Sequence, residues 1–122
     1  MAAKECTRNS PAAAILIPMI RKAFLMTVHP GRESEYARRH QPIWSELAEM
    51  LREHGVHNYS IFSEPGTGRC VAYVEIESEA RWDAIARTDV CRRWWRHMAD
   101  IMETNPDASP TTRVLTEVFH LD

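Results

Sequence analysis

The chain has 122 residues, of which 44% are hydrophobic and 26% charged, proportions typical of one soluble globular domain and unlike those of disordered, fibrous or coiled-coil proteins. Fifteen lysines and arginines against 17 aspartates and glutamates give a net charge of -2, so no basic excess favours a nucleic-acid partner. The cysteines are odd in number and share no Cys-x-x-Cys spacing, which favours free thiols in a reducing, cytoplasmic compartment.

The N-terminal residues 1–18 are expected to form a poorly ordered extension before a single domain that covers residues 19–122. An apolar run at residues 12–20 contains Pro18, leads directly into basic residues and has no small-residue cleavage site, so we do not interpret it as a secretory signal. The run is also far shorter than the roughly 20 apolar residues that span a membrane, so no membrane association is predicted.

A strand and a long helix are predicted to open the domain. Residues 20–28 are apolar in both alternating sets and end at a His-Pro-Gly turn, which indicates a strand with both faces covered. Residues 33–54 repeat apolar and aromatic side chains at helical spacing and are followed by Gly55, so they are predicted to form one helix. Pro42 lies inside this helix, and we expect it to kink the helix close to His40.

The second half of the domain is predicted to contain a hairpin, a helical region and a last strand, at residues 56–63 and 69–77, 78–102, and 113–121. Ser78 is expected to cap the helical region at its start. Thr88 and Asp89 offer a second N-cap, so an interruption is expected there.

The order of the predicted elements is β-α-β-β-α-β, which defines an α+β, ferredoxin-like fold with both helices on one face of a four-stranded antiparallel sheet. The first and third strands are apolar on both sides, so the other face of the sheet also needs a cover. A second subunit stacked sheet against sheet is the simplest cover, and it would make the protein a homodimer, a dimeric α+β barrel.

Two polar side chains are expected to point inward from the first helix. Tyr36 and His40 are four residues apart, in line with the apolar stripe that faces the sheet. A buried imidazole or phenol needs a hydrogen-bond partner or a wet cavity. The pair therefore belongs either to a satisfied core network or to the wall of a pocket, and the kink at Pro42 leaves room beside the imidazole for the second alternative.

Trp94 and Trp95 are the second candidate group. Adjacent helical residues diverge by about 100°, so at least one of the two indoles should line an edge or a cavity. An indole offers a flat apolar face to a pyranose and an N–H to one of its hydroxyls, although two bulky core residues would give the same sequence. Tyr59 could also reach the helices, but the phase of its strand is not decided by the sequence. The histidines and cysteines show no metal-ligand spacing, and no phosphate-binding glycine loop is present, so neither a metal nor a cofactor is predicted.

The segments RKAFLMTVHPG, EYARRHQPIWSEL, HGVHNYSIF, TDVCRRWWRHM and NPDASP together resemble the L-rhamnose mutarotase family. The resemblance runs from Met19 to the C-terminus and leaves only the N-terminal extension without a counterpart. It implies a small, cofactor-free, homodimeric α+β barrel that interconverts the α and β anomers of L-rhamnose by acid–base ring opening and closure. It also implies that His40 is the proton donor and that the sugar-contacting residues are Tyr36, Tyr59, Trp94 and Trp95. Two alternatives stay open on the same fold, a cofactor-independent monooxygenase and a non-catalytic sugar-binding module.

Overall fold

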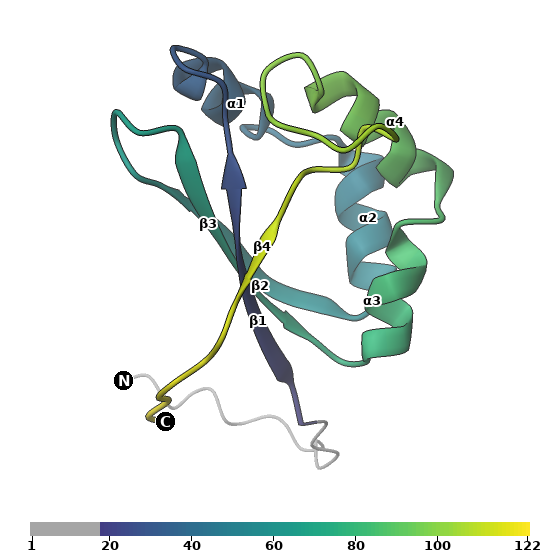
Figure 1. Cartoon of the computed structure of the whole chain (residues 1–122). Coiled ribbons are helices and arrows are strands. Elements are labelled where there is room, and N and C mark those ends of the chain that lie inside the picture. Colours follow the sequence, from purple (N-terminus) through teal and green to yellow (C-terminus); the bar gives the residue numbers. More distant parts are fainter. Residues whose placement is uncertain (1–17) are drawn as a thin grey trace.

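The computed structural model describes residues 18–122, so the predicted N-terminal extension lies outside the described residues except for Pro18. The described chain forms one antiparallel sheet in the order β2-β3-β1-β4, with β1 at Ile20–Thr27, β2 at Val56–Ser63, β3 at Arg69–Ile76 and β4 at Arg113–Leu115 (Figure 1). This strand order confirms the predicted ferredoxin-like topology.

All helices of the described region cover the same face of the sheet: α1 at Glu33–Arg39, α2 at Ser45–Glu53, α3 at Glu79–Ile85 and α4 at Asp89–Met98 (Figure 1). The Ser78 hydroxyl accepts the amide of Arg81 and begins α3, and the Thr88 hydroxyl accepts the amide of Cys91 and begins α4. The predicted interruption at Thr88 is therefore confirmed. No helix in residues 18–122 has the length and apolar character needed to cross a membrane.

The prediction of one kinked helix over residues 33–54 is wrong, because the chain leaves the helix after Arg39 and resumes it only at Ser45. Proline has no amide hydrogen, so Pro42 cannot donate to the carbonyl of Arg38, and its ring would press against that carbonyl. The amide of Gln41 donates a hydrogen bond to the Arg38 carbonyl instead, with 3.2 Å between nitrogen and oxygen, and the first helix ends there. The result is a full turn of non-helical chain that begins at His40.

The last predicted strand, residues 113–121, is also too long. β4 pairs with β1 only at Arg113–Leu115, opposite Ala23–Leu25. Beyond it, Val118 and Phe119 are 93% and 77% exposed. An alternating apolar pattern forms a strand only where a neighbouring edge or face can cover it, and among residues 18–122 this segment has no strand partner beyond Leu115.

The core lies between the sheet and the helices. On β3, Ala72, Val74 and Ile76 face the helices and are completely buried, whereas Val71 and Tyr73 point to the opposite face and stay half-buried. Figure 1 shows no described helix on that opposite face. The apolar residues expected on both sides of the sheet are therefore covered on one side only in the single chain.

Candidate active site

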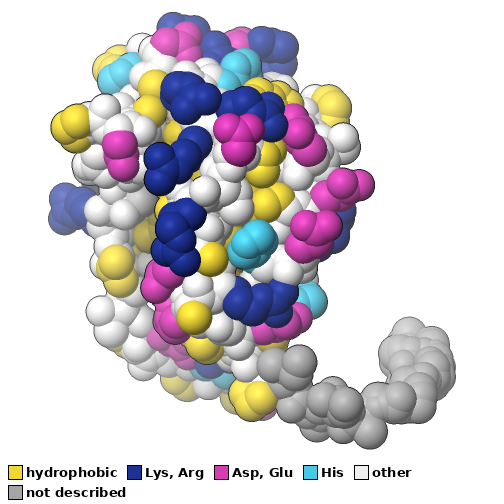
Figure 2. Space-filling view, turned by 90° about the vertical axis from the view of Figure 1, so that its right-hand side faces the viewer, with side chains coloured by type: hydrophobic (Ala, Val, Ile, Leu, Met, Phe, Trp, Pro, Cys, Tyr) yellow, Lys and Arg dark blue, Asp and Glu magenta, His cyan; other side chains and the backbone are white. Residues whose placement is uncertain are grey.

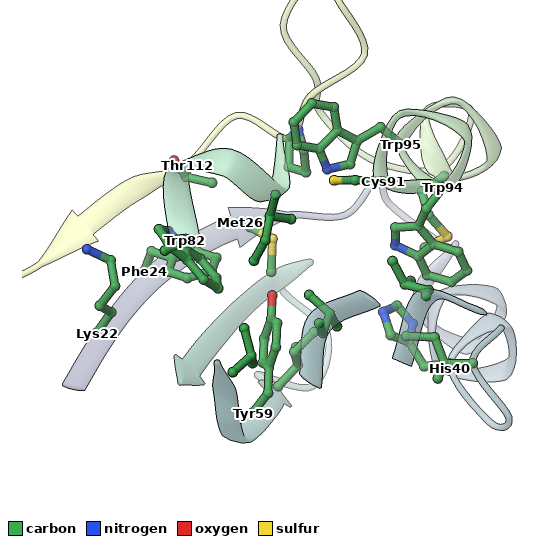
Figure 3. A pocket seen from close by; sticks show the side chains of 18 of the residues that line it. Lys22, Phe24, Met26, His40, Tyr59, Trp82, Cys91, Trp94, Trp95 and Thr112 are labelled. Carbon is green, nitrogen blue, oxygen red and sulfur yellow. The ribbon is translucent and has the colours of Figure 1, made fainter. Parts of the chain in front are cut away.

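A hollow of about 1080 Å³ opens between the sheet and the helical layer. Its walls come from β1, β2, all the described helices and the segment that leads into β4 (Figure 3). The volume is at the upper end of small-molecule sites, and like most such sites the hollow has mainly apolar and aromatic walls with a few polar groups.

His40 lies at the C-terminal end of α1, where the helix break fixes its tautomer. The His40 amide bonds the carbonyl of Ala37 at 3.1 Å, so the Tyr36 carbonyl, its partner in a continuous helix, is free. The Nδ1 atom of the His40 ring lies 2.7 Å from that carbonyl oxygen. A carbonyl only accepts, so Nδ1 donates its hydrogen, and the Nε2 atom of the neutral ring carries a lone pair.

Aromatic rings surround the His40 imidazole. The Tyr36 ring lies at 4.4 Å between centroids, and the Trp94 ring meets the imidazole edge-on at 5.3 Å. Burial lowers the pKa of His40 below its ordinary value, and the hydrogen bond to the Tyr36 carbonyl opposes this shift only in part. His40 is thus neutral at physiological pH and a stronger acid once protonated.

Two tyrosines also line the hollow, Tyr36 on α1 and Tyr59 on β2. An irregularity in the pairing of β2 between His57 and Ser60, with Asn58 at a φ of 47°, sets the phase that the sequence left undecided. Tyr59 consequently packs on Trp82, with 6.2 Å between centroids, and Figure 3 shows its hydroxyl directed into the hollow.

Desolvation raises the pKa of both hydroxyls, that of Tyr59 to about 12, although 37% of the Tyr59 surface is exposed. Neither the Tyr36 nor the Tyr59 hydroxyl has a hydrogen-bond partner within the part of the chain that is described. Both are therefore protonated donors that a ligand can use.

Trp94 and Trp95 both line the hollow, in agreement with the divergence expected for neighbours on a helix. Figure 3 shows Trp94 above His40 and Trp95 beside Cys91, so the two indoles border different parts of one wall. The structure thus gathers all the predicted site residues, Tyr36, His40, Tyr59, Trp94 and Trp95, around a single hollow.

Sequence reasoning missed three further aromatic residues of the site: Phe24 and Trp82 line the hollow, and Trp44 packs against Trp94 without lining it. Trp44 meets Trp94 edge-on at 5.1 Å and supports it from behind. Phe24 and Trp82, with centroids 6.3 Å apart, form the opposite end next to Tyr59. The signal was the high number of tryptophans in a short chain, but their separation in the sequence hid their common location. Within residues 18–122, no group of three or more potential metal ligands is found.

The topology and the site define a class: small ferredoxin-like α+β proteins that hold a histidine in a largely aromatic pocket between the sheet and the helices. The model of the L-rhamnose mutarotase family matches residues 21–121. An L-rhamnose mutarotase of Opitutus terrae is 64% identical over 104 residues, which are 85% of this chain and 100% of that protein. The chain therefore belongs to the L-rhamnose mutarotase family, a family of anomer-interconverting carbohydrate isomerases, and the resemblance seen in the sequence is confirmed.

Solved structures agree with this assignment. The L-rhamnose mutarotase of Formosa agariphila has a TM-score of 0.77 and 36% identity, and the match covers 84% of this chain and 99% of that one. A putative antibiotic biosynthesis monooxygenase from Nitrosomonas europaea has a TM-score of 0.59 at 14% identity, covering 86% of this chain and 95% of that one. The second likeness extends to the fold alone, so it does not favour the monooxygenase alternative.

Proposed function

We propose that this protein interconverts the α and β anomers of L-rhamnose in the hollow around His40. The observation that carries the proposal is the His40 imidazole: its Nδ1 donates to the Tyr36 carbonyl, its Nε2 has no hydrogen-bond partner among residues 18–122, and the residue lines an aromatic cavity. The family relatives supply the substrate, since the Opitutus terrae and Formosa agariphila proteins are L-rhamnose mutarotases.

The reaction needs one proton delivered to the ring oxygen and one removed from the anomeric hydroxyl. The bond between C1 and the ring oxygen then breaks, the aldehyde rotates, and closure on its other face returns both protons. In the donor role, the His40 imidazolium gives its Nε2 proton to the ring oxygen on opening and recovers it on closure, a contribution of roughly 10²- to 10⁴-fold. Its lowered pKa makes this imidazolium a readier donor than an ordinary histidine.

The raised pKa values of Tyr36 and Tyr59 argue against either tyrosine as the group that takes the anomeric proton. Their raised pKa values keep Tyr36 and Tyr59 protonated, so they serve as hydrogen-bond donors and are poor bases. A water molecule, or a carboxylate of the cavity wall such as Glu33, is the better acceptor.

Tyr36, Tyr59, Trp94 and Trp95 are proposed to hold the sugar. The two hydroxyls donate to sugar oxygens, and the indoles pack on C–H faces of the ring. An aromatic wall also buries the 6-methyl group of a deoxy sugar, which discriminates by about 1 kcal/mol against a hydroxymethyl group. The aldehyde carbon must stay loosely held so that it can rotate.

The protein is proposed to act as a cytoplasmic homodimer. Phe62 on the uncovered sheet face is 66% exposed, and Val118 and Phe119 after β4 are 93% and 77% exposed, so large apolar side chains stay in water at both edges of the sheet. A second copy that covers this face restores the two-sided strands seen in the sequence. The buried, unpaired thiols of Cys70 and Cys91 suit a reducing compartment.

The test compares His40→Asn with His54→Asn. His54 ends α2 as His40 ends α1, and its Nδ1 lies 2.8 Å from the Met50 carbonyl, but His54 does not line the described hollow. Saturation-transfer NMR on equilibrated L-rhamnose is expected to show exchange at least about 10²-fold slower for His40→Asn and close to wild type for His54→Asn. Equal rates in the two variants would remove His40 from the mechanism.

Measurements on the wild-type protein also distinguish the mutarotase from the two alternative functions, and His40 as a proton donor from His40 as a base. Binding without faster exchange would indicate a sugar-binding module, and oxygen consumption with an aromatic substrate would indicate a monooxygenase. As a donor, His40 makes kcat/KM fall when the pH rises through its pKa, which lies below the ordinary value. A kcat/KM that rises through the same pKa would show that His40 acts first as a base.

A further inference from the structure

The helix that carries His40 has little to hold it in place. α1 spans Glu33–Arg39, and Tyr36 is its only buried residue. The break after Arg39 disconnects it from α2, so α2 does not fix its direction. A small tilt of α1 would move the imidazole relative to the indole of Trp94, which lies on α4.

The Arg39 side chain connects α1 with the end of α4. Its Nε donates to Glu35 on the same helix at 2.7 Å, and its Nη1 donates to the carbonyl of His97 at 2.7 Å. The guanidinium also forms a two-pronged ion pair with Asp100, at 2.9 and 3.3 Å. The His97 carbonyl is in the last turn of α4, where carbonyls lack helical partners. Arg39 therefore ties the end of α1 to the end of α4.

The tie lies next to the contact that the site requires. Arg39 directly precedes His40, and His97 comes one turn after Trp94, so the ion pair and the contact between the imidazole and the indole connect the same two helix ends. Only 12% of the Arg39 side chain is exposed, whereas the arginines of the other helix ion pairs, Arg38, Arg81 and Arg93, are 71%, 45% and 39% exposed. Figure 2 shows the acidic and basic side chains that are interspersed over the helical face. Planar guanidinium groups hold such bidentate pairs in one geometry.

We propose that Arg39 is a positioning residue for the His40 site: it sets the distance and angle between His40 and Trp94 without contacting the sugar. Arg39 is not among the described residues that line the hollow. The expected effect of Arg39 on kcat rests on the proposed function, but its effect on the surroundings of His40 can be measured without turnover.

Arg38 provides a matched control. It is the neighbouring arginine, pairs with the same carboxylate of Glu35, and is 71% exposed. Among the described residues it has no bond to α4. A loss that is specific to the tie between α1 and α4 should therefore occur in Arg39→Gln and be absent from Arg38→Gln.

The experiment measures anomer exchange of L-rhamnose and titrates the His40 ring by NMR in both variants. Arg39→Gln is expected to lower kcat by about 10- to 100-fold with a smaller change in KM, because a displaced proton donor is costly in the reacting complex. Water that enters beside the loosened ring should also raise the pKa of His40 toward its ordinary value. Arg39→Lys keeps the positive charge but loses the two-pronged hydrogen bonding of the guanidinium, so its kcat should fall between those of the wild type and Arg39→Gln.

Unchanged kcat and an unchanged His40 titration in Arg39→Gln, with only a lower melting temperature, would overturn the proposal. If Arg39→Gln does not fold, Asp100→Asn removes the ion pair just beyond α4 from an exposed position and leaves only the bond to the His97 carbonyl, and smaller changes in the same two readouts decide. If the wild type shows no exchange, the proposed function fails, while the His40 titration still tests Arg39.

Discussion

Tyr59→Phe is the sharpest test of whether the hollow binds a sugar, because it removes one hydroxyl and leaves the ring packed on Trp82. The Tyr59 hydroxyl has no described protein partner, so the free energy of unfolding should change by no more than about 0.5 kcal/mol. A hydrogen bond to the bound sugar contributes about 0.5–1.5 kcal/mol, which corresponds to a Kd or KM raised by about 2- to 12-fold.

The control is Tyr73→Phe on the opposite face of the sheet. The Tyr73 hydroxyl donates to Glu75 at 2.7 Å and is not part of the hollow. Concentration-dependent saturation-transfer NMR gives KM and kcat for both variants, and urea denaturation gives their stability. A Tyr59→Phe protein with wild-type KM but a loss of more than 1 kcal/mol in unfolding free energy, of the order of a lost buried contact, would show that Tyr59 serves the fold and would refute the reasoning.

Three further predictions concern pH, the hairpin and assembly. The pKa of His40 is lower in the folded protein than in the unfolded chain, so the unfolded chain binds more protons at pH values between the two. The free energy of unfolding should therefore fall as the pH drops through that window. Urea denaturation of the wild type and of His40→Asn at several pH values isolates the part of this pH dependence that is due to His40. Gly68→Ala would place a Cβ 2.5 Å from the Val28 carbonyl at a φ of 79° and should cost about 3 kcal/mol, whereas Gly66→Ala, with the same sign of φ and open space, should cost about 1 kcal/mol; thermal melts compare them. Val118→Asp should weaken the proposed homodimer in sedimentation experiments, and an unchanged dimer would place this segment outside the interface.

Local chemistry made much of the fold predictable. The order of the elements followed from alternation and helical spacing, and Ser78 and Thr88 marked the starts of α3 and α4 because a hydroxyl at an N-cap satisfies a free amide. The Tyr36 and His40 pair was also predictable, since residues four apart on a helix share one face.

What could not be predicted depends on contacts between distant segments. A proline in a helical pattern can kink or break the helix, and the sequence alone does not decide which. The structure shows a full break at Pro42, with Tyr36 of α1 in one core cluster and Leu47 and Met50 of α2 in another. The pocket-facing phase of Tyr59 depends on an irregularity at Asn58, a residue type that tolerates a positive φ but does not by itself predict one within a strand. The bonds of Arg39 to the end of α4 join residues about sixty positions apart, and no local pattern indicates them.

The comparison of His40 with His54 shows where the chemistry of the site originates. Both histidines end a helix, and both donate Nδ1–H to the carbonyl four residues earlier, so the same local device fixes the same tautomer twice. The device alone makes no active site, since His54 is outside the hollow. The two cases differ in the place where each helix ends: α1 ends before Pro42, so that His40 lies against Trp94 and lines the hollow, whereas α2 ends outside the hollow.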